Sequence, residues 1–218
     1  MSKEDIKNII PGFTMGIIRA IISHPFEMLK LKSQINHNEK LYTNLFKGIH
    51  YSIVTNSIER GIQFGLYEKF KKNDNNIIIS STKSSIISTF ISLPYNILLL
   101  RKVILKTSIN VNKNIFTKSI GLEYLRNLSG SIIFLYSYNY LKEKDIDIIY
   151  RAPISSCFVW LFTYPIDTYK NILISSNKIN LNLKNLYKGI EYPLIRSIPS
   201  SIIGFYVYEY MLKYINNK

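Results

Sequence analysis

Apolar residues concentrate in six segments of the chain, roughly residues 9–31, 49–70, 77–105, 119–141, 146–174 and 190–215. Each segment approaches the ~20 residues that a helix needs to cross a bilayer, but serines, glycines or charged residues interrupt every one. Two readings stay open: core helices of a soluble bundle, or membrane helices whose polar faces line a wet cavity. Both readings predict an all-α fold.

One two-helix unit recurs three times along the chain. Pro25, Pro94 and Pro165 lie 69 and 71 residues apart. Small residues stand thirteen and nine positions before each proline, namely Gly12, Ser81 and Ala152, then Gly16, Ser85 and Ser156. The sequences LFKG and LYKG mark the same turn in the first and third copies. We therefore expect repeats over residues 1–72, 73–143 and 144–218, the second of them degenerate.

Two charged motifs accompany the repeats. PFEMLK and PIDTYK follow the pattern proline-x-acid-x-x-base, and PYNILL is a weakened copy. YEKFK, YNYLK and YEYML follow the pattern aromatic-acid-x-x-base, with Asn for the acid in the second and Leu for the base in the third. An acid and a base three residues apart share one helix face and could pair with each other. Because the register holds in three copies, partners in neighbouring repeats are favoured.

These motifs resemble those of the mitochondrial carrier family over nearly the whole chain, most closely its giant-virus nucleotide carriers. The resemblance implies six transmembrane helices in three tandem repeats with pseudo-threefold symmetry, around a central cavity. Proline removes a backbone donor, so the odd-numbered helices are expected to kink at Pro25, Pro94 and Pro165. The resemblance further implies a monomeric multi-pass protein of the mitochondrial inner membrane, which would be that of a host cell if the protein is viral. It also implies contact with lipid such as cardiolipin.

The resemblance also implies two gates, in which the acid of one repeat meets the base of the next. The expected matrix gate comprises Glu27, Lys30, Gln34, Asn96, Asp167 and Lys170. In it Lys30 with Asp167 is the one ion pair, Asn96 faces Lys170 and Glu27 faces Leu99. The expected cytoplasmic gate comprises Tyr67, Glu68, Lys71, Tyr138, Asn139, Lys142, Tyr208 and Glu209. Its two ion pairs, Glu68 with Lys142 and Glu209 with Lys71, make the matrix gate the looser one.

The expected solute site lies between the gates. Thr55, Arg126 and Arg196 occupy equivalent positions of the three repeats, and the resemblance directs them to the centre, with Asn127, Arg19 and Arg60 nearby. The forked donors of arginine favour phosphate or carboxylate groups. The resemblance implies exchange of nucleotides or deoxynucleotides of the ATP, dATP or TTP type by alternating access. A carrier of another phosphate ester or carboxylate, or a carrier-like protein that no longer transports, remains an alternative.

Composition narrows the partners further. The chain has 28 Lys and Arg against 14 Asp and Glu, which suits nucleic acid, anionic lipid or a phosphorylated solute. A nucleic-acid-binding module would have its lysines on one face. The lysines of this chain lie instead in loops and at helix ends, so no nucleic-acid partner is expected. The single cysteine, Cys157, and three histidines at no ligand spacing predict no metal site. No phosphate-binding loop or nucleophile motif occurs, so neither enzymatic activity nor a cofactor is expected.

Overall fold

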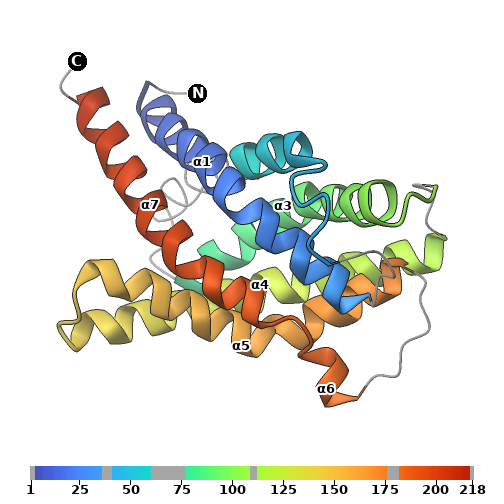
Figure 1. Cartoon of the computed structure of the whole chain (residues 1–218). Helices are drawn as coiled ribbons and strands as arrows, with labels where there is room; N and C mark the ends of the chain where they lie inside the picture. Colours follow the sequence, from blue (N-terminus) through green and yellow to red (C-terminus); the bar gives the residue numbers. More distant parts are fainter. Residues whose placement is uncertain (1–2, 36–40, 60–76, 109–111, 176–181, 217–218) are drawn as a thin grey trace.

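The structure, a computed structural model, describes residues 3–35, 41–59, 77–108, 112–175 and 182–216 (Figure 1). The regular elements within these ranges are all helices, which confirms the predicted all-α fold. They are α1 (Lys3–Gln34), α3 (Ile77–Ile97), the π-helix η1 (Leu98–Ile104), α4 (Lys113–Glu143), α5 (Ile148–Ser175), α6 (Leu183–Leu186) and α7 (Glu191–Asn216). Residues 49–59 are also helical.

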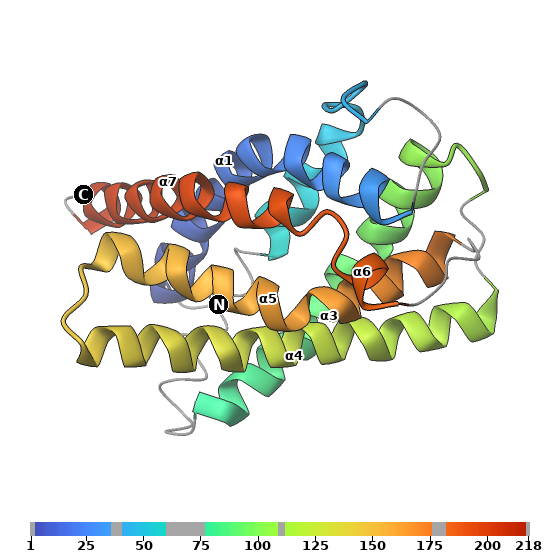
Figure 2. The same ribbon diagram turned by 60° about the horizontal axis from the view of Figure 1, so that its bottom comes forward.

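Two pairs of long helices organise the chain. A short turn joins α4 to α5, and the two helices lie antiparallel along most of their length (Figure 2). Helix α1 lies against α7, α5 also contacts α7, and α3 packs on α4 (Figures 1 and 2). The first and last long helices are therefore neighbours, although almost the whole sequence separates them.

The three motif prolines all lie inside helices. Pro25 is within α1, Pro94 within α3 and Pro165 within α5. Four residues after Pro94 the hydrogen-bond pattern changes to that of η1, in which the Leu105 amide donates to the Leu100 carbonyl at 3.0 Å. This hydrogen bond from residue i+5 to residue i encloses one more residue per turn than an α-helical bond does. Such short π-helical segments are frequent at functional sites.

The turns that end in Gly48 and Gly189 adopt the same backbone conformation. Their φ angles are +80° and +83°, in the left-handed region where glycine avoids the Cβ clash. A Cβ on Gly48 would lie 2.9 Å from Val103 Cγ2, and one on Gly189 would lie 3.0 Å from Ser33 Cβ. Each glycine thus lets its turn approach another segment closely: η1 in the first case, α1 in the second.

A side chain from the preceding long helix holds each of these turns. His24 Nε2 lies 3.1 Å from the carbonyl oxygen of Lys47, and the Tyr164 hydroxyl donates to the Lys188 carbonyl at 2.8 Å. His24 and Tyr164 each directly precede a motif proline, and Lys47 and Lys188 each directly precede a turn glycine. The first and third copies of the repeated sequence therefore share a tertiary contact at matching positions.

The largest apolar cluster lies where α1, α3, η1 and α5 meet. Its buried members are Met28, Leu31, Ile35, Leu93, Tyr95, Ile97, Leu99, Leu100, Val103, Ile104 and Ile174. These residues surround the segments that follow the motif prolines. The cluster therefore fixes the positions from which the charged motif side chains project.

Polar side chains are as common as apolar ones among the buried residues. In the described ranges, 20 polar or charged residues are buried against 18 hydrophobic ones, while 28 large hydrophobic side chains are exposed. The buried charged residues among them, including Lys30, Glu123, Asp167 and Lys170, are unusual, because charged side chains are almost never fully buried in water-soluble domains unless they are paired. No helix in the described ranges combines the length and the apolar character that a membrane span requires.

Candidate functional site

Seven charged side chains, four of them buried and three half-buried, form a charge cluster between α1, α4, α5 and α7. They are Glu27 and Lys30 on α1, Glu123 and Arg126 on α4, Asp167 and Lys170 on α5, and Arg196 on α7. The set contains four cations and three carboxylates. Its net charge is therefore one positive unit, in a region from which water is largely excluded.

Asp167 lies at the centre of the charge cluster. Its Oδ2 accepts from Lys30 Nζ at 2.9 Å, and its Oδ1 accepts from Lys170 Nζ at 3.2 Å and lies 3.7 Å from Arg126 Nε. The side chain of Asp167 is 2% exposed. A carboxylate this deeply buried requires compensating charge, and here three cations from three different helices supply it.

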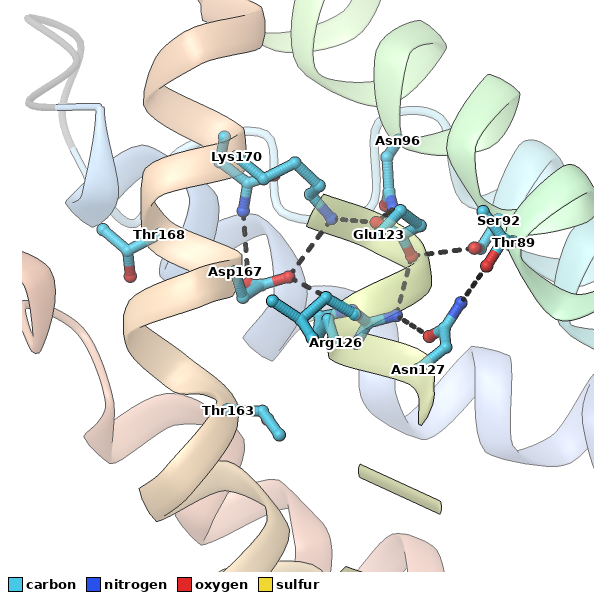
Figure 3. Close-up of polar contacts among 12 residues, drawn as sticks. Thr89, Ser92, Asn96, Glu123, Arg126, Asn127, Thr163, Asp167, Thr168 and Lys170 are labelled. Atoms are coloured by element: carbon cyan, nitrogen blue, oxygen red, sulfur yellow. Dashed lines mark hydrogen bonds and ion pairs between the residues drawn. The ribbon is translucent and has the colours of Figure 1, made fainter. Parts of the chain in front are cut away.

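Glu123 is the second hub of the cluster and is completely buried (Figure 3). Lys170 Nζ donates to its Oε2 at 2.5 Å, and Arg126 Nη2 donates to its Oε1 at 2.8 Å. Helix α3 contributes two neutral donors, Ser92 Oγ at 2.8 Å and Asn96 Nδ2 at 3.4 Å. One carboxylate on α4 thus connects α3 with α5.

The third carboxylate of the cluster, Glu27, lies 3.6 Å from Arg196 Nη1. Trp160, the only tryptophan of the chain, lies close to two cations of the cluster. Lys30 Nζ is 5.1 Å and the Arg196 guanidinium carbon 5.2 Å from the centre of its ring. Both distances are in the range of cation–π attraction, so the indole links Arg196 to Lys30.

Gln34 braces α1 against α5 one helical turn beyond Lys30. Its Nε2 donates to Thr168 Oγ1 at 2.9 Å, and its Oε1 accepts from Asn171 Nδ2 at 2.8 Å. The same Asn171 amide lies 3.2 Å from Asp167 Oδ2. The neutral brace and the Lys30–Asp167 ion pair therefore share a hydrogen-bond network.

The structure brings together two of the predicted solute residues with the predicted gate residues. Arg126 and Arg196 both belong to the charge cluster, where each binds a carboxylate. Asn127 Oδ1 accepts from Arg126 Nη2 at 2.7 Å, and Asn127 Nδ2 donates to Thr89 Oγ1 at 3.2 Å. The predicted site thus contains an arginine that is already oriented by two side chains of its own helix.

The structure describes two of the other three predicted solute residues. Thr55 is half-buried on the helix over residues 49–59. The side chain of Arg19 packs against α7, because a Cβ on Gly204 would lie 3.0 Å from Arg19 Cδ. Arg60 lies outside the described residues.

Most of the predicted cytoplasmic gate also lies outside the described residues. This applies to Tyr67, Glu68 and Lys71, and to the side chains of Tyr208 and Glu209. Near the end of α4, Asn139 and Lys142 are exposed and Tyr138 stacks on Phe134 with ring centres 5.9 Å apart. The two ion pairs expected at this gate remain predictions.

The expectation of a single ion pair at the matrix gate is wrong. Lys170 pairs with Glu123, and Glu27 pairs with Arg196, in addition to the pair of Lys30 and Asp167. The additional partners come from the even-numbered helices α4 and α7, whereas the motif rule pairs the odd-numbered helices only. The ranking of this gate as the looser one depended on that count and loses its basis.

Three other residues expected at this gate also have contacts that involve neither of the two expected ion-pair partners. Leu99 lies in the apolar cluster. Asn96 and Lys170 meet at Oε2 of Glu123. Glu123 was missing from the sequence-based site, although a lone acid within the apolar segment 119–141, three residues before Arg126, is a recognisable signal.

The charge cluster is suited to binding anions rather than metal ions. Its excess charge is positive, and its arginines present forked donors that match phosphate and carboxylate oxygens. Among the described residues, no three His, Cys, Asp or Glu side chains come together in a way that could hold a metal ion. Within the chain, the cations of the cluster bind the carboxylates of Glu27, Glu123 and Asp167.

Comparison with known proteins gives similarities to carriers. No protein-family model matches the chain. A mitochondrial carrier-like protein of Acanthamoeba polyphaga mimivirus is 24% identical over 145 aligned positions, which cover 63% of this chain and 61% of that protein. The match thus spans less than two thirds of the viral protein.

Two proteins of Dictyostelium discoideum match more of the chain. Mitochondrial substrate carrier family protein A is 22% identical, with 91% of this chain and 82% of that protein covered. Mitochondrial substrate carrier family protein Y is 21% identical, with 96% and 69% covered. These similarities confirm the predicted resemblance to the mitochondrial carrier family, whose members are transporters rather than enzymes.

Proposed function

Starting from this similarity to the mitochondrial carrier family, we propose that the chain is a transmembrane carrier that exchanges anionic solutes by alternating access. Nucleotides and deoxynucleotides are the first candidates, and the mitochondrial inner membrane, of a host cell if the protein is viral, is the proposed location. The charge cluster carries the proposal. A buried to half-buried set of four cations and three carboxylates, contributed by both halves of the chain, favours an anionic solute.

The distribution of apolar side chains supports a membrane setting. Phe90, Tyr136 and Phe162 are 68%, 77% and 66% exposed, and they are three of 28 exposed large hydrophobic residues in the described ranges. Exposed apolar surface on this scale is unfavourable in water and favourable against lipid. Charged side chains inside membrane proteins face the protein interior, as those of the charge cluster do.

Three cyclic repeats, over residues 1–72, 73–143 and 144–218, are part of the proposal. The turn at Gly48, in the first repeat, packs on Val103 in the second, and the turn at Gly189, in the third, packs on Ser33 in the first. One contact joins the first repeat to the second and the other joins the third repeat to the first, as expected for a ring of three repeats. They support the cyclic arrangement, with kinked odd-numbered helices around the solute site.

We propose that the solute binds Arg126 and Arg196 in place of their present carboxylate partners. The side chains of Arg126 and Arg196 are 21% and 13% exposed, which makes them the most accessible cations of the charge cluster. A phosphate group presents more negative oxygens than a glutamate and binds guanidinium groups in the same bidentate manner. Lys30, Asp167 and Gln34 then belong to the gate that closes below the solute.

Exchange in liposomes tests the proposal. Purified protein is reconstituted into vesicles loaded with ATP, and uptake of labelled nucleotides, other phosphate esters and dicarboxylates is measured from outside. We expect counter-exchange of at least one nucleotide, and its loss in Arg126→Gln and in Arg196→Gln. Lys184→Gln removes an exposed lysine of α6 and is the matched control, expected to exchange at the wild-type rate.

The panel also separates the alternative functions. If carboxylates or simple phosphate esters are taken up and nucleotides are not, the protein is a carrier with a different substrate. Absence of any exchange by correctly inserted protein would refute transport and favour a carrier-like protein that does not transport. Fluorescence of the single tryptophan gives a second readout, because Trp160 contacts Arg196 and should respond when an anion binds that arginine.

A further inference from the structure

Helix α3 lacks both charges of the proline motif. Where α1 and α5 carry Glu27 and Asp167, α3 carries Asn96, and the base position, in η1 directly after α3, is the buried Leu99. A helix without charge at this level has no ion pair of its own with α5. Nevertheless α3 is tied to the charge cluster, because Ser92 and Asn96 both donate to one carboxylate.

That carboxylate belongs to Glu123, on the neighbouring helix α4 (Figure 3). Each of its oxygens is shared between α3 and a cation. Oε1 accepts from Ser92 and Arg126, and Oε2 accepts from Asn96 and Lys170. The side chain is 0% exposed, so without these four donors the buried carboxylate would be strongly unfavourable.

We propose that Glu123 replaces the gate carboxylate that is absent at residue 96. It acts as a positioning residue, because it holds α3 and α5 together through Lys170 and restrains Arg126 at the solute site. The inference rests on the proposed function in one respect: the helices that Glu123 connects are those that must separate during transport.

The geometry allows the carboxylate to be moved back to α3. Asn96 and Lys170 contact the same oxygen of Glu123, so an acid at residue 96 would lie within reach of the lysine. Moving the acid also leaves the net charge of the cluster unchanged, whereas Glu123→Gln raises it by one unit. The double variant therefore shows whether the protein needs a carboxylate at this position or only the same net charge in the cluster.

The test compares Glu123→Gln, Asn96→Asp and the double variant in the full chain. ATP–ATP exchange in liposomes gives the maximum rate and the half-saturation concentration, and thermal unfolding in detergent gives the stability. For Glu123→Gln we expect a maximum rate lower by about tenfold or more, as expected for one lost hydrogen bond to a buried charge. Its half-saturation concentration should fall, since Arg126 is released from its carboxylate.

The double variant should regain the maximum rate to within about threefold, a difference below one typical hydrogen bond, and should regain the unfolding temperature. Glu143→Gln, an exposed acid at the end of the same helix, should leave all three quantities at the wild-type values. A Glu123→Gln variant that fails to fold while the double variant folds would also support the proposal.

The inference is overturned if the double variant behaves like Glu123→Gln, if neither of the two folds, or if Glu123→Gln equals the wild type. These outcomes are distinct from failure of the proposed function. If the wild type exchanges no solute, the carrier proposal fails, and the unfolding temperatures of the three variants still decide whether the carboxylate can be moved from Glu123 to residue 96.

Discussion

Replacing Asp167 by asparagine removes the group around which three cations gather. Lys30, Lys170 and Arg126 lie 2.9, 3.2 and 3.7 Å from its oxygens. With an effective dielectric constant of about 20, each contact corresponds to roughly 5 kcal/mol of gross attraction. Desolvation cancels most of this, and removing one member of a buried ionic group typically costs about 3–5 kcal/mol.

Lys30→Met is the informative comparison. It removes one of the three contacts of Asp167 and leaves the carboxylate paired with Lys170 and Arg126, so we expect a loss of only about 1.5–3 kcal/mol, as for one hydrogen bond to a charged group. A protein of this size loses about 2–4 °C of unfolding temperature per kcal/mol. Asp167→Asn should therefore unfold roughly 10 °C below the wild type, and Lys30→Met well above that variant.

The double charge reversal Lys30→Asp with Asp167→Lys gives the sharpest distinction. If the two residues formed an isolated pair, the reversal would restore stability. In the charge cluster, the lysine introduced at position 167 meets Lys170 and Arg126, so we expect no recovery.

Circular dichroism during heating in detergent measures these differences, with Glu143→Gln as the control. Recovery in the double reversal would refute the three-cation network, as would equal losses in Asp167→Asn and Lys30→Met.

Two further predictions concern the repeated turns. Gly48→Ala should lower the unfolding temperature by the equivalent of about 1–2 kcal/mol, because an L-residue at φ +80° is strained and its Cβ has a neighbour at 2.9 Å. Gly121→Ala is the matched control in the same thermal scan. It lies in α4 with nothing within 4 Å of a new Cβ, so the change should stabilise slightly. Tyr164→Phe removes a 2.8 Å hydrogen bond to the Lys188 carbonyl and should cost about 1–3 kcal/mol in the same scan, whereas Tyr169→Phe, at an exposed tyrosine, should not.

The helices and part of the site could be predicted from local sequence. Six apolar segments predicted an all-α protein, the proline motif pointed to Lys30 and Asp167, and the family resemblance pointed to Gln34; the structure places all three in one network. Such features depend on spacing along one chain segment. Helical periodicity decides which residues share a face, and repetition at about 70 residues shows which faces are equivalent.

The partners of the motif residues could not be predicted in the same way. The motif rule assumed that odd-numbered helices meet only one another, and it therefore missed the pairs of Lys170 with Glu123 and of Glu27 with Arg196. A pairing between helices depends on their crossing and rotation, which side-chain packing over the whole bundle sets. Sequence spacing contains no information about that rotation.

The sequence by itself determined that this protein is helical and that an acid and a base lie at fixed steps after two of its three motif prolines, and it predicted a unit repeated three times. Only the tertiary structure decided that Glu123 accepts hydrogen bonds from α3, which has no acid in its proline motif, and that two cations lie close to the ring of Trp160. The physical reason is that buried charges are stabilised by whichever groups lie within a few ångströms, and distance in space becomes defined only when all the helices have packed.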